Sequence, residues 1–448
     1  MIIRPILCLA SAATALMTVA PCSAQTRESN DEHPFVVPLQ IPAVADNTPS
    51  SLTGKWGGLR TRLRDDGVDL KASYGSETAW NPEGGEQNRI TETGQFVFTA
   101  QIDTEKLIGL KGGTFQAVVT YRRGQDLGAV ANLGVLQQVQ EVYGRGQTWR
   151  LTRFFYLQKF LDGHADVRFG RLTMGGEFGK FTCLSENLSF CGSPAGNLVG
   201  DYWYNWPVSQ WGIRGRLRNS AGYIMVGAYE VNPRNLDNTF TIGYFHGATG
   251  VLLPAEIALT PRLGEDRLPG SYKLGGWVNT SNGNDVALDI YGQPAKVTGL
   301  APLQHSSRYG VYAQFQQQLT GRATDAQVEP DVVQGLSVFF NATLADRATS
   351  TNDNQFATGL FYTGLLRSRP KDDFELAIAR THVNSRTWIG LPPGAARPNS
   401  EYAAEIDYGV HATGWLTLRP NLQYIVDPGG LSSKTNVVIV GMKGSVSL

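Results

Sequence analysis

The stretch EYAAEIDYGVHATGWLTLRPNLQYIV, residues 401 to 426, decides the fold, because polar and apolar side chains alternate along most of it. In its first half, one face carries Tyr402 and Ile406, and the other carries Glu405 and Asp407. Its second half has one face made of Leu416, Leu418, Leu422 and Tyr424 and another made of Thr417, Arg419, Asn421 and Gln423. A period of two residues predicts strands with one apolar and one polar face.

The charges on the polar face distinguish a membrane barrel from a soluble β protein. Glu401, Glu405 and Asp407 share this face, where a packed sandwich core would not hold them and a water-filled lumen would. Tyr402 and Tyr408 lie near strand ends, which is typical of the aromatic girdles of outer-membrane barrels. An exported array of β-sandwiches with a solvated face is the alternative.

About sixteen segments of some ten residues each show such alternation, and this is the length that a strand needs to cross a bilayer. We place their starts near residues 68, 91, 114, 149, 165, 210, 222, 251, 271, 308, 334, 355, 372, 402, 415 and 435. No helical pattern separates them, which argues against a parallel α/β fold. We therefore predict an all-β fold, a transmembrane antiparallel β-barrel of about sixteen strands over residues 68–448.

Three short segments precede the barrel. Residues 1–24 combine Arg4 with an apolar run and small residues up to Ala24, which is typical of a cleaved secretory signal peptide. Residues 25–52 are polar and proline-containing, and we interpret them as a loose lead-in. Residues 53–67 place Leu59, Arg60 and Leu63 at helical spacing and predict a short helix before the first strand.

Composition and motifs exclude several functional classes. The 448 residues carry 39 basic and 39 acidic side chains, so no charge excess points to a nucleic-acid partner. The sequence has no HExxH, GxSxG or P-loop motif, and its six histidines are scattered without metal-ligand spacing. We therefore expect neither an enzyme nor a protein that holds a metal or another cofactor.

Cys183 and Cys191 are the cysteines that remain after loss of the signal peptide. An exported pair eight positions apart predicts a disulfide that closes the loop 183–191. The pair lies in a connection from about residue 173 to 209, and loops of this length are usually functional. This loop either folds into the barrel and narrows the pore or stays outside as a rigid surface loop. Residues 129–143 have helical spacing and predict a helix in another loop.

Inward-facing charges on the first strands are the candidates for a pore constriction. On each strand, the alternation with lipid-facing apolar residues fixes which side chains point into the lumen. This phase selects Glu77, Arg122, Arg153, Arg168 and Arg171. Such side chains donate hydrogen bonds to sugar hydroxyls or accept them, and opposite charges create a field across a pore. Each of the five can instead line the wall or pair with a neighbour.

Six stretches, in this order along the chain, resemble the OprB family of carbohydrate-selective porins. They are LTGKWGGLRTRLRDDGVDL, YGSETAWNPEGG, VRFGRLTMGGEF, FTCLSENLSFCGSP, WPVSQWGIRGRL and LRPNLQYIVDPGG. Together they span almost the whole chain that follows the signal peptide. One departure is the end of the chain, Leu448, where outer-membrane barrels usually have an aromatic residue.

The resemblance implies an outer-membrane barrel of a Gram-negative bacterium, through which glucose-type monosaccharides diffuse passively into the periplasm. It also implies that the helical segment 53–67 lies on the periplasmic side. The implied partners are carbohydrate substrates and outer-membrane lipids, with no nucleic acid, and the homotrimer that porins of this size often form is left open. A general anion-preferring porin and an exported sugar-binding protein without transport are the functional alternatives.

Overall fold

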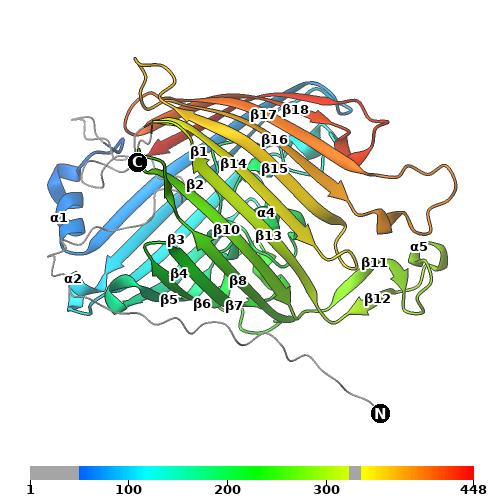
Figure 1. Ribbon diagram of the computed structural model, residues 1–448, viewed down its shortest axis with the longest axis horizontal. Coiled ribbons are helices and arrows are strands. Elements are labelled where there is room, and N and C mark those ends of the chain that lie inside the picture. Colours follow the sequence, from blue (N-terminus) through cyan, green and yellow to red (C-terminus); the bar gives the residue numbers. More distant parts are fainter. Residues whose placement is uncertain (1–49, 322–333) are drawn as a thin grey trace, which may run out of the picture. The chain divides into compact units, whose positions relative to one another are not determined.

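The computed structural model describes residues 50–321 and 334–448, and within them the chain is mainly β-strand (Figure 1). Sixteen strands pair antiparallel in one closed ring, because β1 pairs with both β2 and β19. The predicted all-β barrel is therefore confirmed, and its closure leaves no strand edge unpaired. None of the helices in the two described ranges is long and apolar enough to span a membrane. The predicted signal peptide and most of the lead-in fall outside the described residues.

The barrel strands begin close to the predicted positions. They are β1 (Val68–Glu83), β2 (Ile90–Asp103), β3 (Gly113–Gly124), β4 (Trp149–Phe160), β5 (Ala165–Leu172), β6 (Gln210–Asn219), β7 (Gly222–Val231), β8 (Gly250–Leu259), β10 (Leu268–Asn279), β13 (Arg308–Gln318), β14 (Gly335–Ala345), β15 (Asn352–Thr363), β16 (Asp373–Val383), β17 (Ser400–His411), β18 (Leu416–Val426) and β19 (Val437–Ser447). The largest differences are at predicted starts 271 and 355, where the strands begin at residues 268 and 352.

The remaining strands and α-helices lie before β1 or in the connections between barrel strands. These are the short strands β9 (Arg262–Leu263), β11 (Gly283–Asp289) and β12 (Pro302–His305) and the helices α1 (Leu59–Asp65), α2 (Thr104–Ile108), α3 (Leu127–Val130), α4 (Pro194–Val199) and α5 (Ala295–Thr298). In Figure 1, α1, α2 and the C-terminus lie at one end of the barrel, and β11, β12 and α5 lie at the other. We call these the helix end and the loop end.

The predicted short helix lies where the first and last strands meet. Helix α1 falls within the predicted segment 53–67, and β1 begins at Val68 as expected. Arg60 donates hydrogen bonds to the carbonyl oxygens of Leu70, at 3.2 Å, and Leu448, at 3.1 Å. Because these two carbonyls belong to the first strand and to the end of the chain, Arg60 bridges the seam at which the barrel closes.

Side chains alternate between the outer and inner faces as predicted. Ile406 and Leu422 face outward and are 41% and 47% exposed, as expected for lipid-facing positions. Glu405 and Gln423 point inward but are only 1% and 0% exposed. The expectation that these inward side chains meet water is therefore wrong, because two loops enter the barrel and cover them.

The two loops are loop 2, residues 125–148 between β3 and β4, and loop 3, residues 173–209 between β5 and β6; both start at the loop end. The helix predicted over 129–143 is wrong, since loop 2 is irregular beyond α3. The N–H of Leu136 donates to Glu401 Oε2 at 2.7 Å, and that of Val142 donates to Glu77 Oε2 at 2.9 Å. Main-chain donors bonded to the wall cannot form the hydrogen bonds of a helix.

Hydrophobic clusters fasten loop 3 inside the barrel. The rings of Phe181 in loop 3 and Phe339 on β14 are 4.8 Å apart, and Phe361 on β15 packs against both. A second cluster joins Phe178, Leu198, Tyr202 and Trp203 of the loop to Tyr229, Leu252, Trp277 and Tyr312 of the wall. Of the two expected courses of loop 3, the structure therefore has the inward one.

Candidate functional site

Loop 3 crosses the lumen and is bonded to the wall on both sides. Near its start, the N–H of Gly179 donates to Glu256 Oε2 on β8 at 2.8 Å. Glu256 also accepts hydrogen bonds from the hydroxyls of Tyr223 and Tyr312, each at 2.7 Å. The segment Cys183–Cys191, closed by a disulfide, then meets strands β17 to β19. Loop 3 is thus bonded to β8 near its start and to β17, β18 and β19 at the disulfide-closed segment.

Strands β16 to β19 and β1 are neighbours in the barrel, and we call this part of it the acidic wall. Glu405 on β17 accepts the backbone N–H groups of Glu186 and Asn187, each at 2.8 Å. Gln423 on β18 accepts from the Asn187 side chain at 2.9 Å and donates to the carbonyl of Val139 in loop 2, also at 2.9 Å. The charged side chains that the acidic wall buries are Glu77, Asp373, Glu375, Glu401, Glu405, Asp407, Arg419 and Lys443.

Glu77, a predicted constriction residue, is fully buried in this wall. Lys443 Nζ lies 3.1 Å from Glu77 Oε1 and 3.0 Å from Glu141 Oε1 of loop 2. The same ammonium group donates to the carbonyl of Ser185 in loop 3 at 2.9 Å. Glu77 therefore fastens the loops to β1, and its burial does not favour direct contact with a solute.

Glu186 is the carboxyl group that loop 3 brings to the acidic wall. Its Oε2 accepts a hydrogen bond from the Asn421 side chain at 2.5 Å, and its Oε1 is buried without a hydrogen-bond partner among the described residues. Burial, followed by the charge of Glu77 and that of Glu405, raises the pKa of Glu186 well above its ordinary value. This environment favours the protonated form of Glu186.

Strands β3 to β6 form the basic wall, where loop 3 begins. Its inward arginines are Arg122, Arg150, Arg153, Arg168, Arg214 and Arg216. Asp166 on β5 pairs with Arg214 and, at 2.8 Å, with Arg216. The wall therefore keeps an excess of positive charge, opposite in sign to the acidic wall.

Glu177 is the carboxyl group that loop 3 brings to the basic wall. Its Oε1 lies 2.6 Å from Arg168 Nη1, and its Oε2 lies 3.1 Å from Arg214 Nε. Burial opposes the ionisation of this carboxyl group, but the charges of Arg168, Arg214 and Arg153 outweigh it and lower the pKa of Glu177 to about 2. Glu177 is therefore ionised at neutral pH.

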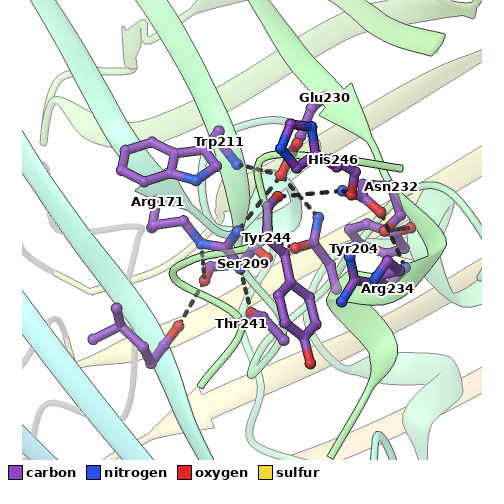
Figure 2. A network of polar contacts seen from close by, with 12 residues as sticks. Arg171, Tyr204, Ser209, Trp211, Glu230, Asn232, Arg234, Thr241, Tyr244 and His246 are labelled. Atoms are coloured by element: carbon purple, nitrogen blue, oxygen red, sulfur yellow. Dashed lines mark hydrogen bonds and ion pairs between the residues drawn. The ribbon is translucent and has the colours of Figure 1, made fainter. Parts of the chain in front are cut away.

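Arg171, another predicted constriction residue, is the centre of a buried network (Figure 2). Its guanidinium group donates to the carbonyl of Ser209 and to Thr241 Oγ1, each at 2.6 Å, and to Asn235 Oδ1 at 3.0 Å. Glu230 Oε1 is 3.5 Å away, and the Arg171 side chain is fully buried. Arg171 thus fixes the loop after β7, and a direct sugar contact is not supported by this placement.

Arg122 is also buried, between loop 2 and the wall. Its Nε donates to Gln95 Oε1 on β2 at 2.8 Å, and its Nη1 donates to the carbonyl of Tyr143 at 2.9 Å. Gln95 Oε1 accepts a further hydrogen bond from Trp206 Nε1 of loop 3, also at 2.8 Å. Arg122 therefore holds both loops. Its burial, like that of Arg171, does not support a direct contact with a sugar.

Arg153 and Arg168 are the two predicted constriction residues that stay partly exposed. The guanidinium of Arg168 lies 4.4 Å from the centre of the Phe155 ring, and that of Arg153 lies 5.5 Å from a Trp206 ring. Cation–π contacts of this kind hold a guanidinium while leaving its edge accessible. Contact of these two arginines with a sugar stays a prediction.

Several charged residues of the site were missed by the sequence-based selection. Arg214 and Arg216 carried a signal, because they alternate with apolar residues along β6 as Arg168 does along β5. Glu177 carried none, since a loop has no periodicity that shows which side chain points inward. Among the described residues, one group has the spacing of metal ligands, Glu141 with Cys183 and Cys191, but these two sulfurs are bonded to each other.

The geometry can guide a neutral, hydroxyl-rich solute. Guanidinium groups donate hydrogen bonds, so the partly exposed Arg153 and Arg168 can replace water around sugar hydroxyls. Opposed charges across a lumen also orient dipoles and select against solutes with strong net charge. Trp206, beside Arg153, adds ring surface of the kind that packs on the C–H face of a sugar.

Comparisons with known proteins agree with this geometry. The family model for the carbohydrate-selective porin, OprB family, matches residues 87–448. Porin B of Pseudomonas aeruginosa is 42% identical over 415 residues, which cover 88% of this chain and 90% of that protein. The putative porin QuiX of Acinetobacter baylyi is 30% identical over 419 residues, which cover 87% of this chain and 91% of that protein.

Two solved structures extend the likeness to the fold. The high-pH structure of Pseudomonas putida OprB superposes with a TM-score of 0.84 at 39% identity and covers 91% of this chain and all of that one. The low-pH structure of the same protein gives a TM-score of 0.58 at 29% identity, with 90% of this chain and all of that one covered.

Proposed function

Because this chain belongs to the OprB family of carbohydrate-selective porins, we propose that glucose-type monosaccharides diffuse passively through it into the periplasm. The family makes it a carbohydrate porin of the outer membrane of a Gram-negative bacterium, and a channel rather than an enzyme. The proposal adds the class of sugar and the direction of flow. It places α1 on the periplasmic side, at the helix end of the barrel.

The observation that carries the proposal is that loop 3 connects two walls of opposite charge inside the barrel. Loop 3 lies between them and leaves Arg153 and Arg168 partly exposed on the basic side. A solute without net charge gains hydrogen bonds from these two arginines and loses little by leaving them, as conduction requires. An anion would instead be held by the arginines, and a cation would be repelled by them.

A general anion-preferring porin is the second candidate, and the excess of arginine on β3 to β6 favours it. The proposal differs from this candidate in its expected effect of glucose. Conductance of single channels in planar bilayers should fall in steps or smoothly as glucose is added, because a bound sugar obstructs ions. If glucose changes the ion current no more than a sugar alcohol of equal size does, the general porin is the better description.

Two partners belong to the proposal as well. Outer-membrane lipids are expected around the barrel, since outward apolar side chains such as Ile378, Leu418 and Val440 are largely exposed. A homotrimer is expected from the size of the barrel. Native mass spectrometry in detergent would give one, two or three chains per particle and decide the state.

A further inference from the structure

Glu177 stands out because it pairs with arginines on two neighbouring strands of the basic wall, β5 and β6. We infer that Glu177 is a positioning residue, whose reach aims the guanidinium groups of Arg168 and Arg214 and so sets the sugar preference of the pore, while its charge sets the ion preference. This inference rests on the proposed function for its sugar part. Its ion part depends only on the barrel being a water-filled channel.

The first step is the pairing of the two strands. Arg168 on β5 and Arg214 on β6 are direct cross-strand partners and both point inward. Like charges placed opposite each other in this way repel and destabilise a sheet. Glu177 lies between them, with one carboxylate oxygen on each arginine at 2.6 and 3.1 Å. A single carboxylate from a loop therefore relieves a repulsion that the sheet itself creates.

The second step is the difference between the two arginines. Arg214 has a second carboxylate partner, Asp166, which comes from β5 and also binds Arg216. The carboxylate that Arg168 contacts within the described residues is Glu177, and its remaining support is the Phe155 ring. Loss of Glu177 should therefore free Arg168 far more than Arg214.

The third step is the rigidity of Glu177 itself. Its N–H donates to the carbonyl of Met174 at 2.9 Å, and the N–H of Phe178 donates to the same carbonyl at 3.0 Å. Phe178 is fully buried and meets the Tyr229 ring edge-on at 6.0 Å. Because the main chain is fixed on both sides, the length of the side chain decides whether both arginines can be reached.

These steps separate the charge of Glu177 from its reach. Glu177→Gln keeps the length and removes the charge, so the basic wall gains one net positive charge. Glu177→Asp keeps the charge but is one methylene shorter, so it cannot hold Arg168 and Arg214 together. A merely structural role would make the two substitutions similar in effect, since either would loosen the same packing.

The test uses the full-length protein in planar bilayers with a salt gradient across them. Glu177→Gln should raise the permeability ratio of chloride to potassium roughly tenfold, because one unit charge about 6 Å away in water changes the permeability of each ion about threefold and in opposite directions. Glu177→Asp should leave this ratio near the wild-type value. Adding Arg168→Gln to Glu177→Gln should restore the wild-type ratio. The inference is overturned if Glu177→Gln leaves the ratio unchanged, or if the second substitution does not reverse the shift.

Glu92→Gln is the matched control. Glu92 also pairs with an arginine of a neighbouring strand, Arg123 at 2.9 Å, but on the outward face, where it bonds to Tyr74 and Ser76. The control should leave the permeability ratio and the glucose response unchanged, and a shift as large as that of Glu177→Gln would overturn the inference. Should Glu177→Gln fail to assemble, Glu177→Asp alone decides, because an unweakened glucose response in it would contradict the need for reach.

The sugar and ion readouts distinguish two failures. If wild-type channels show no response to glucose, the proposed function fails, while the permeability ratios still decide whether Glu177 sets the charge of the pore. If wild-type channels respond to glucose and both Glu177 variants respond equally well, the proposed function stands and the role of Glu177 is wrong.

Discussion

Loop 3 carries one carboxyl group to each wall of the lumen, and the two groups are in opposite electrostatic states. Glu177 lies against Arg168 and Arg214, which lower its pKa to about 2 despite its burial. Glu186 is equally removed from water, but its charged neighbours include Glu77 and Glu405, and burial and these charges raise its pKa. Since burial acts in the same direction on both, the neighbours decide which of them is ionised.

The comparison shows that the loop is attached by different bonds on its two sides. At the basic wall the bond is an ion pair between side chains, which cancels part of the charge of the wall. At the acidic wall the loop offers backbone N–H groups to Glu405, and a carboxylate with two such donors is stabilised without a cation. Both walls therefore keep their sign of charge after the loop has docked.

The largest effect in this comparison is expected from Glu405→Ala. The substitution leaves the buried N–H groups of Glu186 and Asn187 without their acceptor, at a cost of about 1–3 kcal/mol each. Hydrogen exchange should show faster exchange of these two amides, with little change at Gly179, whose acceptor is Glu256. Glu405→Gln keeps one acceptor oxygen, so its free-energy cost should be about half that of Glu405→Ala. Equal exchange in wild type and Glu405→Ala would mean that contacts other than those with Glu405 hold the segment Cys183–Cys191, the tip of loop 3.

The next largest effect is expected from loss of the disulfide. Closure of the loop between Cys183 and Cys191 should contribute roughly 2–3 kcal/mol at most, in the chain-entropy account. Replacing both cysteines by serine should loosen the tip around Glu186 before it affects the attachment of Glu177. Mass spectrometry of the unreduced wild-type protein must first find the pair oxidised, and two free thiols there would contradict the prediction.

A smaller effect, of opposite sign at the two ends of the loop, is expected from pH. The pKa of Glu177 is depressed, so its stabilisation is complete above the unfolded value of about 4.5 and is lost as the pH falls toward 2. The pKa of Glu186 is raised, so attachment of the tip weakens as the pH rises above about 4.5, by at most about 1.4 kcal/mol per pH unit. As the pH rises, amide exchange, corrected for its intrinsic pH dependence, should therefore become slower around Glu177 and faster around Glu186. Glu186→Gln should remove the pH dependence at the tip alone.

Much of the barrel could be predicted from the sequence, because the alternation of side chains repeats the geometry of a strand. That period placed β1 at Val68 and gave the correct inward phase of Arg153 and Arg168. It could not show that Glu77 and Arg171 are covered, since coverage depends on loops whose course has no period. Of the five residues selected for the constriction, Arg153 and Arg168 are partly exposed, whereas Glu77, Arg122 and Arg171 are buried.

The error in loop 2 has the same origin. Apolar residues such as Val139 and Val142 recur at intervals that a helix would also produce, but here they recur because each is buried among wall and loop residues. The decisive information was the pairing of backbone donors with Glu77 and Glu401, which lie far away along the chain. A contact of such large sequence separation leaves no mark on local spacing.

The smallest expected effect is the most direct test of the comparison, and it concerns Glu186→Gln. If Glu186 is protonated at neutral pH, an amide of the same shape replaces it without any change of charge, and it keeps an oxygen that can accept from Asn421. The chloride-to-potassium permeability ratio at pH 7 should then equal that of the wild type, whereas Glu177→Gln shifts it roughly tenfold. At alkaline pH the wild-type channel should become less anion-preferring as Glu186 loses its proton, and Glu186→Gln should lag behind it. A shift at pH 7 as large as that of Glu177→Gln would mean that both carboxyl groups are ionised and that the two ends of loop 3 do not differ in charge.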